Sequence, residues 1–141
     1  MIDQASVDIV IVNWNSGPQL QACIDSIRLY GNAHLGRVVV VDNGSVDGST
    51  DFLVGQADVD LVLTGENLGF GRACNLGAAR GNSAFVLFLN PDACLMPGSL
   101  DLPLKFFSRP ESEQIGIVGI PLVNEDRTVQ RTCARAPTLG N

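Results

Sequence analysis

Three apolar runs in the sequence are each followed directly by polar side chains that can bind a ligand. Each run is rich in Val, Ile, Leu or Phe and has the length of a β-strand. The polar groups that follow the runs are Asn13-Trp14-Asn15, Asp42-Asn43-Gly44-Ser45 and Asn90-Pro91-Asp92. In open sheets of parallel strands, ligands bind beyond the carboxyl ends of the strands, where neighbouring loops lie side by side. The three groups are therefore expected to converge on one ligand.

Asp42 has the chemistry to bind a nucleotide. Its carboxylate accepts hydrogen bonds, so it can bind the imide N–H of a base or a ribose hydroxyl. Asn43 and Gly44 follow it, and small residues let the backbone approach a ring closely. The same residues, with DGS shortly after them, are also typical of an Asx turn that binds nothing. Both interpretations of Asp42 stay open on these residues alone.

Asp92 is a candidate ligand of a divalent cation. It follows the run Val-Leu-Phe-Leu-Asn-Pro, which brings a carboxylate to the rim of a dry sheet. Proteins bind Mg²⁺ and Mn²⁺ through one or two carboxylates together with substrate phosphates, and such a cation would neutralise a departing diphosphate. The alternative is that Asp92 caps the next helix, because Pro-Asp is common before a helix.

The loop of residues 65–72, with the sequence GENLGFGR, is a candidate diphosphate site. It precedes a predicted helix, and its free N–H groups and Arg72 can face an anion. Asn67 and Gly69 lie in the same loop. The loop is not a Walker loop and lacks the GxGxxG order, and glycines at a helix start often serve packing instead. Packing is therefore the alternative interpretation.

The elements that must position these side chains follow the alternating pattern of an α/β fold. Strands are predicted at residues 7–13, 37–42, 60–64, 84–90 and 115–120. Helices are predicted after an N-cap at Ser16, up to about residue 56, through residue 80 and at 97–107, with a hairpin at 122–132. The run 84–90 is the most hydrophobic and is expected at the centre of the sheet. The pattern predicts a mostly parallel, doubly wound sheet.

Length and composition predict one domain over residues 1–141. The chain has 141 residues, of which 45% are hydrophobic, so an ordinary core can form without disulfides or metals. Its 15 acidic and 9 basic side chains give a formal net charge of -6. That charge argues against a nonspecific nucleic-acid binder, because such a protein needs clustered Lys and Arg.

The spacing of the cysteines and the N-terminal residues exclude several further classes of protein. No CxxC spacing occurs among Cys23, Cys74, Cys94 and Cys133, which argues against a zinc knuckle or a redox pair and favours free, mostly buried thiols. The first residues carry acids where a secretory signal needs basic residues. No apolar run is long enough to span a bilayer. We therefore expect a cytoplasmic protein, with a position peripheral to a membrane as the alternative.

Five motifs occur in a fixed order along the chain. They are VNWN at 12–15, DNGSVDGS at 42–49, ENLGFGRACNLG at 66–77, LFLNPDA at 87–93 and VGIPLVNEDRTVQRTCARAPT at 118–138. Together they resemble the successive motifs of family 2 glycosyltransferases, with the closest similarity to the rhamnosyltransferase-like branch. The resemblance covers about residues 7–138.

This resemblance implies a GT-A fold, which is a Rossmann-like doubly wound sheet. It implies a nucleotide-diphosphate sugar donor such as dTDP-rhamnose or a UDP-sugar, a divalent Mg²⁺ or Mn²⁺ ion, and inversion at the anomeric carbon. It also implies a glycan or lipid-linked acceptor, as in polysaccharide biosynthesis. Each of these is an expectation about function for this chain.

The resemblance also assigns roles to residues. Asn13 and Asn15 lie beside the nucleoside, and Asp42, followed by Asn43 and Gly44, reads the pyrimidine. The loop that faces ribose and diphosphate contains Asn67, Gly69 and Arg72. The place of the family's DxD metal motif is taken by Asn90-Pro91-Asp92, with Asp92 as the metal-binding acid.

The sequence departs from the family pattern at two points. Asn90 stands where the first acid of the DxD motif is expected, which leaves Asp92 as the main charged ligand. The family's catalytic base lies in a Glu-Asp motif that is expected beyond Asn141, in the half that builds the acceptor site. We therefore expect a donor-binding half that is truncated before the acceptor-binding half and inactive in transfer by itself, because a positioned base contributes about a hundred- to ten-thousand-fold.

Two other classes of function are compatible with parts of this sequence. The first is a non-catalytic module that binds a nucleotide or nucleotide sugar and self-associates as a homodimer, since an unfinished sheet leaves an edge exposed. The second is a dinucleotide-dependent dehydrogenase. The run Asn13 to Gly17 argues against it, because it lacks the glycines that let the backbone approach a pyrophosphate.

Overall fold

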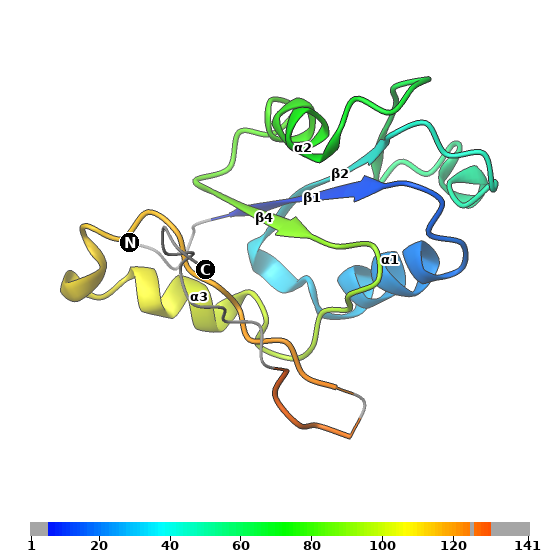
Figure 1. Cartoon of the computed structure of the whole chain (residues 1–141). Coiled ribbons are helices and arrows are strands. Elements are labelled where there is room, and N and C mark those ends of the chain that lie inside the picture. The colour runs from blue at the N-terminus through cyan, green and yellow to red at the C-terminus, as the bar shows by residue number, and fades with distance from the viewer. Residues whose placement is uncertain (1–5, 125, 131–141) are drawn as a thin grey trace, which may run out of the picture.

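The computed structural model describes residues 6–124 and 126–130, and it contains one parallel sheet between two layers of helices (Figure 1). The strands are β1 (Val7–Asn13), β2 (Leu35–Asp42), β3 (Asp60–Leu63) and β4 (Phe85–Leu89). The α-helices are α1 (Gln19–Tyr30), α2 (Phe70–Ala78) and α3 (Asp101–Phe107). Short 3-10 helices span Asn32–His34, Asp51–Leu53 and Pro110–Ser112.

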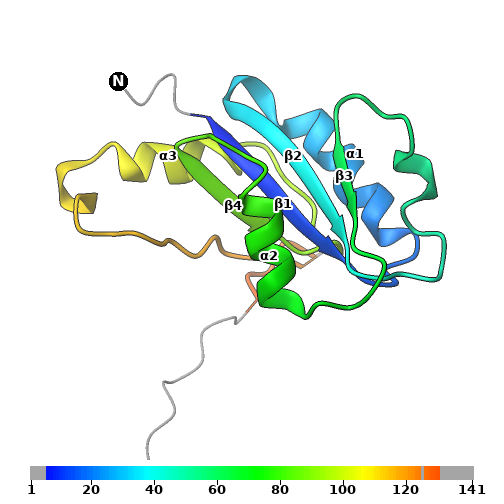
Figure 2. The ribbon, with the colours of Figure 1, turned by 90° about the horizontal axis from the view of Figure 1, so that it is seen from above.

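The strand order is β3-β2-β1-β4, with every pairing parallel (Figure 2). The chain runs outward from β1 through β2 to β3 and then returns to place β4 on the other side of β1. Helix α2 covers one face of the sheet, and α1 and α3 lie on the opposite face (Figure 1). The predicted α/β, doubly wound architecture is therefore confirmed.

Alternation along β1 and β2 divides the core into two layers. Successive side chains of a strand point to opposite faces, so Ile9 and Ile11 pack with α1, while Val10 packs with Ala73 of α2. The predicted inner face of α1 is confirmed: its buried residues are Leu20, Cys23, Ile24 and Ile27. Both central strands are thus buried on two sides, as expected for a parallel sheet covered by crossover helices.

Gly77 lets α2 lie close to the sheet. A Cβ atom added at this position would be 2.4 Å from Cγ1 of Val10 and 3.1 Å from Cγ2 of Val41. Of the residues expected to face the sheet, Ala73 and Gly77 are buried, whereas Leu76 is exposed. This close packing fixes α2, and with it the loop that leads into the helix.

The position predicted for β4 is wrong. Its run is the most hydrophobic, yet β4 forms an edge of the sheet within the described residues. Its side chains are only partly covered, and Val86 and Phe88 are exposed. Hydrophobicity measures how much surface a strand needs to bury, whereas strand order depends on where the crossover connections lead. The two central strands are β1 and β2.

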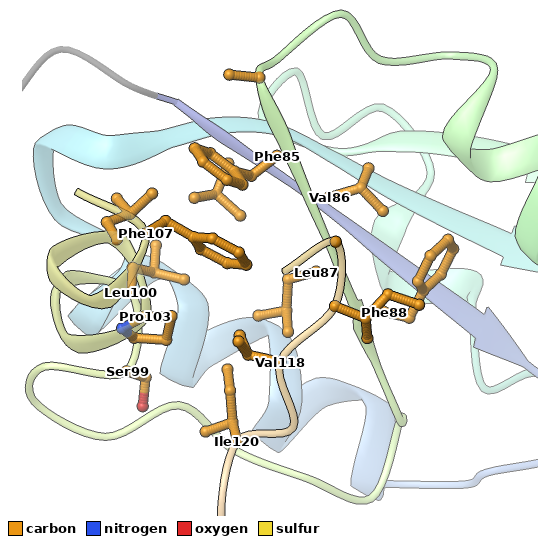
Figure 3. A pocket seen from close by; sticks show the side chains of 15 residues that line it. Phe85, Val86, Leu87, Phe88, Ser99, Leu100, Pro103, Phe107, Val118 and Ile120 are labelled. Carbon is orange, nitrogen blue, oxygen red and sulfur yellow. The ribbon is translucent and has the colours of Figure 1, made fainter. Parts of the chain in front are cut away.

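The strand predicted at 115–120 does not form. Apolar composition alone is not enough, because an extended segment is a strand only when its backbone pairs with a neighbour. Here Val118 and Ile120 lie opposite β4 across an apolar cavity of about 360 Å³ (Figure 3). Leu100 and Phe107 line the cavity from the side of α3 (Figure 3).

Other boundaries differ from prediction by a few residues. Helix α1 begins after Pro18, and Ser16 is not its N-cap, because the Ser16 hydroxyl bonds to Asn13 instead. Helix α3 begins at Asp101 and not at residue 97, since a turn at Gly98 precedes it. The helix expected up to residue 56 is only the short 3-10 helix Asp51–Leu53. In the described part of the predicted hairpin, Val123 and Val129 form an antiparallel bridge.

A buried carboxylate ties the loops together at the amino end of the sheet. Asp8 on β1 accepts hydrogen bonds from the Arg37 N–H at 2.6 Å, the Ser83 N–H at 2.9 Å and the Ser83 hydroxyl at 2.7 Å. Burial by itself raises the pKa of Asp8, but these hydrogen bonds outweigh it, so the pKa lies below its ordinary value of 3.8. Every described partner is structural, which makes this cluster a support of the fold.

The described cysteines are free thiols, as predicted. Only Cys23 is fully buried, while Cys94 is exposed, so the expectation of mostly buried thiols holds for Cys23 alone. Cys133 lies outside the described residues. None of the helices that the structure describes is long and apolar enough to cross a membrane.

Candidate functional site

The polar groups expected at the site lie at one edge of the sheet. Asn13 pairs in register with Asp42, and Ile11 pairs with Leu89, so β1, β2 and β4 end side by side. Neighbouring strands lie about 4.8 Å apart, which separates the ends of β2 and β4 by roughly 10 Å. The strand order reverses between β1 and β4, and ligands of open α/β sheets bind at such a reversal.

Asp42 uses one carboxylate oxygen in the protein and leaves the other open. Its Oδ1 accepts a hydrogen bond from Nδ2 of Asn13 at 3.2 Å and from the N–H of Ser45 at 3.3 Å. Among the described residues, none donates to its Oδ2. The bond from Ser45 is the turn-type contact expected of an Asx motif. The turn therefore exists, and it leaves an acceptor available to a ligand.

Asn13 is the centre of a buried hydrogen-bond network. Its side chain is 0% exposed, and its Nδ2 lies 3.0 Å from Oγ of Ser45 and 2.8 Å from Oγ of Ser49, besides its contact with Asp42. The hydroxyl of Ser16 donates to its Oδ1. The side chain expected beside the nucleoside is thus occupied by protein partners.

Asn15 joins the loop after β1 to the loop after β2. Its Oδ1 accepts a hydrogen bond from the N–H of Val46 at 2.8 Å, and its own N–H donates to Oγ of Ser45 at 3.0 Å. Asn15 has a φ of 51°, a conformation that Asn tolerates better than most residues. A further link runs from the N–H of Gly17 to Oδ2 of Asp47 at 2.9 Å.

Asn43 joins the loop after β2 to the loop before α2. It is buried, its Nδ2 donates to Oδ1 of Asn67 at 3.0 Å, and its Oδ1 accepts from the N–H of Leu68 at 2.8 Å. A Cβ atom on Gly44, whose φ is 84°, would be 2.8 Å from the carbonyl carbon of Glu66. Gly44 is therefore needed where two protein loops meet, and its small size is not free evidence for the close approach of a base.

The loop before α2 presents open groups at the same edge. Gly69 is the N-cap of α2 with a φ of 82°, and no side chain caps the helix. A Cβ on Gly69 would meet nothing within 4 Å, so packing does not explain this glycine. Arg72 is exposed and bonds to no other described residue. Asn67 is exposed but already accepts from Gly69 as well as from Asn43.

Helix α1 fixes the turn that carries Asn90 and Asp92. The thiol of Cys23 lies 3.7 Å from the carbonyl oxygen of Asn90, and the N–H of Leu95 donates to Oγ of Ser26 at 2.9 Å. Burial raises the pKa of Cys23 to about 12, with further contributions from Cys94 and Asp92, so the thiol keeps the proton it donates. These two contacts from α1 therefore hold the turn in place.

Asp92 is exposed at this turn and has no hydrogen-bond or ion-pair partner among the described residues. It lies well before α3, whose N-cap is Leu100, so the alternative that Asp92 caps the next helix is wrong. The described residues hold no group of three His, Cys, Asp or Glu side chains that could bind a metal. One open carboxylate still fits a cation held mainly by substrate phosphates.

Several residues of this edge were not singled out from the sequence. Ser45 and Ser49 support Asn13, and Thr64 donates to the carbonyl oxygen of Asp42 at 2.8 Å. The two serines lie in the DNGSVDGS motif, so this motif could have identified them from the sequence. Thr64 had no such signal, because its role depends on the loops meeting in space.

Comparison with known proteins agrees with this arrangement. The family model "Glycosyl transferase family 2" matches residues 8–136. An N-acetylglucosaminyl-diphospho-decaprenol L-rhamnosyltransferase of Mycobacterium tuberculosis is 32% identical over 145 residues, which cover 93% of this chain and 46% of that protein. An N-acetylglucosaminyltransferase of Rhizobium is 36% identical over 98 residues, covering 64% of this chain and 21% of that protein. The chain spans less than half the length of these curated relatives.

Solved structures share the fold. A mannosyltransferase from Pyrobaculum calidifontis, in complex with GDP-Man and Mn²⁺, superposes with a TM-score of 0.67 at 23% identity, over 76% of this chain and 33% of that one. Residues 1–349 of TarS from S. aureus give a TM-score of 0.63 at 17% identity, over 83% of this chain and 38% of that one. At these identities the likeness establishes the GT-A fold. Together with the family match, it follows that this chain belongs to glycosyl transferase family 2.

Proposed function

We propose that this chain is the donor-binding half of a glycosyltransferase that uses a pyrimidine nucleotide-diphosphate sugar. The observation that carries the proposal is the presence of two open carboxylate groups at one sheet edge, Oδ2 of Asp42 at the end of β2 and Asp92 in the turn after β4. The two strand ends are separated by roughly 10 Å, a span that one nucleoside diphosphate can bridge.

Each group has a separate task in this proposal. Asp42 accepts a hydrogen bond from the imide N–H of the base. The open N–H groups at the start of α2 and the guanidinium of Arg72 bind the diphosphate. Asp92 holds a Mg²⁺ or Mn²⁺ ion, with Asn90 beside it. When bound, the cation supplies charge neutralisation for the departing diphosphate.

Transfer itself needs groups from outside the described residues. We propose that the sugar, with rhamnose as the first candidate, moves with inversion to a hydroxyl of a glycan or lipid-linked acceptor. The likeness to the rhamnosyltransferase of M. tuberculosis supports that candidate. The catalytic base is expected beyond Asn141, and the 141-residue chain is expected to show little transfer by itself.

Calorimetric titration of the chain with UDP, dTDP and NAD, with and without Mn²⁺, tests this proposal. UDP or dTDP is expected to bind, and Mn²⁺ is expected to strengthen the binding. Asp42→Ala should weaken it while the fold remains intact, because Asn13 keeps both of its serine partners. Preferential binding of NAD would refute the proposal.

The metal role of Asp92 has its own control. Asp92→Ala is expected to abolish the strengthening by Mn²⁺. Glu111→Ala removes an exposed acid of the 3-10 helix after α3 and should leave the strengthening unchanged. Equal strengthening in the Asp92 variant and the unmodified chain would dismiss Asp92 as a ligand.

A second candidate is a nucleotide-binding module that self-associates. The observation in its favour is the edge strand β4, where Val86 is 38% and Phe88 is 50% exposed, with no charged or proline residue in the strand. Such an edge can pair with a second copy. Sedimentation equilibrium decides between the candidates: a dimer that Phe88→Glu dissociates favours the module, and a monomer at all concentrations removes it.

A further inference from the structure

We infer that Asn13 is a positioning residue that sets the base selectivity of Asp42 without touching the nucleotide. The inference rests on the proposed function and deepens it, because it concerns how one base is chosen over another. Its starting point is burial: the side chain of Asn13 is 0% exposed, whereas Asp42 is 7% exposed. Asn13 can therefore act on a ligand only through its neighbours.

The sheet register determines which neighbour Asn13 acts on. Asn13 and Asp42 are partners on adjacent parallel strands, and in-register partners of a pleated sheet point to the same face. The amide of Asn13 donates to Oδ1 of Asp42 at 3.2 Å. The N–H of Ser45 donates to the same oxygen at 3.3 Å. Two donors on Oδ1 fix the rotation of the carboxylate.

The amide of Asn13 is itself held in place. The two N–H groups of its Nδ2 are shared among three acceptors, which are Oδ1 of Asp42, Oγ of Ser45 and Oγ of Ser49. The hydroxyl of Ser16 donates to its Oδ1. An amide with partners on both its oxygen and its nitrogen cannot turn over without leaving polar atoms unpaired, which is costly in a buried site. The orientation of Asn13 is thus determined by the loops after β1 and β2.

A carboxylate with a fixed rotation distinguishes pyrimidines. Its free oxygen only accepts hydrogen bonds. Uracil and thymine carry an N–H at ring position 3, whereas cytosine carries an acceptor there, so two acceptors would face each other. Sites built to form a specific hydrogen bond reject analogues that cannot form it. If the carboxylate could rotate, it would also accept from the amino group of cytosine, and the discrimination would fall.

The experiment compares the affinities of UDP and CDP by calorimetry in the presence of Mn²⁺. Asn13→Ala removes the donor to Asp42, and Asn13→Leu removes it as well but fills the space of the side chain. Ser83→Ala is the matched control, because it removes the hydroxyl group that donates to Asp8 at the opposite edge of the sheet. Thermal unfolding of each variant is followed in parallel.

The unmodified chain is expected to prefer UDP to CDP. In both Asn13 variants, the ratio of UDP affinity to CDP affinity should fall about tenfold, because UDP binds more weakly. A tenfold change corresponds to the loss of about one hydrogen bond. Ser83→Ala should keep the preference even if its melting temperature falls by a similar amount. A structural role alone would weaken UDP and CDP equally.

Each outcome bears on one of the two proposals. An unchanged ratio of UDP to CDP affinity in a folded Asn13 variant overturns the inference, as does an equal loss for both nucleotides. Failure of the unmodified chain to bind either nucleotide contradicts the proposed function instead. If Asn13→Ala does not fold, Asn13→Leu gives the decision, because it fills the space of the asparagine without adding a buried charge.

Discussion

The two carboxylate oxygens of Asp42 differ in their contacts. The sequence leaves two interpretations open, a turn residue or a ligand-binding acid, and the structure confirms the turn contact of Oδ1. The other oxygen has no described partner, and ligand binding by Asp42 stays a prediction. The types and the edge position of the site residues were predictable from the apolar runs before them. Which atoms are already engaged was not predictable, because that depends on contacts between loops.

For Asn43 and Gly44 as well, residue type did not determine the contact partner. Both were expected near the base because they follow Asp42, and both instead contact the loop before α2. Small and amide residues suit a close approach of any partner. Their type alone does not tell a ligand from a second loop of the protein.

The thiol of Cys23 is expected to resist alkylation in the folded protein. Burial raises its pKa to about 12, and only the thiolate reacts at a useful rate. Cys94 is exposed and serves as the internal control. Mass spectrometry of peptides after brief iodoacetamide treatment at pH 8 should find Cys94 modified and Cys23 unmodified. Equal labelling in native buffer, with full labelling of both in denaturant, would contradict the burial of Cys23.

Among the elements, the buried strands were the most predictable. The bounds of β1 agree with prediction at both ends, because an apolar run between polar residues limits a strand on both sides. The order of the strands and the failure of residues 115–120 to pair were not predictable. Both depend on which strands pair with each other. The hydrophobic pattern of a segment does not determine its pairing partner.

The approach of two loops at Gly44 can be tested against a second glycine. Gly44 and Gly55 have φ values of 84° and 81°, but a Cβ would meet Glu66 only at Gly44 and nothing within 4 Å at Gly55. Gly55→Ala should therefore cost about 1 kcal/mol for backbone strain. Gly44→Ala should cost about 1–3 kcal/mol more, because two backbones must separate. Urea unfolding measures both, and equal losses would show that the loops are not in contact.

The Asp8 cluster predicts how the stability of the fold depends on pH. The pKa of Asp8 is lowered in the folded chain, so its hydrogen bonds stabilise the fold above about pH 4 and are lost as the pH falls through the folded pKa. Asp8→Asn should lower the free energy of unfolding at pH 7 by about 2 kcal/mol.

The control for this prediction is the pH profile itself. Stability of the unmodified chain should fall faster below pH 4 than that of Asp8→Asn, so the difference between the two should shrink. Denaturant unfolding at pH 7, 5 and 3 measures it. A difference that grows toward pH 3 would contradict the assignment.

At the scale of the whole molecule, the sheet supports the site and, within the described residues, leaves β4 without a neighbouring strand on one side. Its carboxyl edge carries the interlocked loops of the candidate site, and its β4 side carries exposed apolar groups and the cavity beside Val118 and Ile120 (Figure 3). The cavity lining contains no charged residue, so a nucleotide is not expected there. The family assignment was predictable because its motifs are local in sequence. An exposed sheet edge was also expected, but its position at β4 was not, because strand order is a property of the assembled sheet.

The most direct test of the account locates a bound Mn²⁺ ion by its paramagnetic broadening of amide signals in an NMR spectrum of the chain. With UDP present, Mn²⁺ is predicted to broaden Asn90 and Ala93 most strongly and Asp42 next, and to spare Arg37 and Ser83 at the amino end of the same strands. Without UDP, the broadening should be much weaker, because one carboxylate binds the ion poorly. Broadening centred on Arg37 and Ser83, or broadening that does not depend on UDP, would contradict a nucleotide and cation site at the carboxyl edge of the sheet.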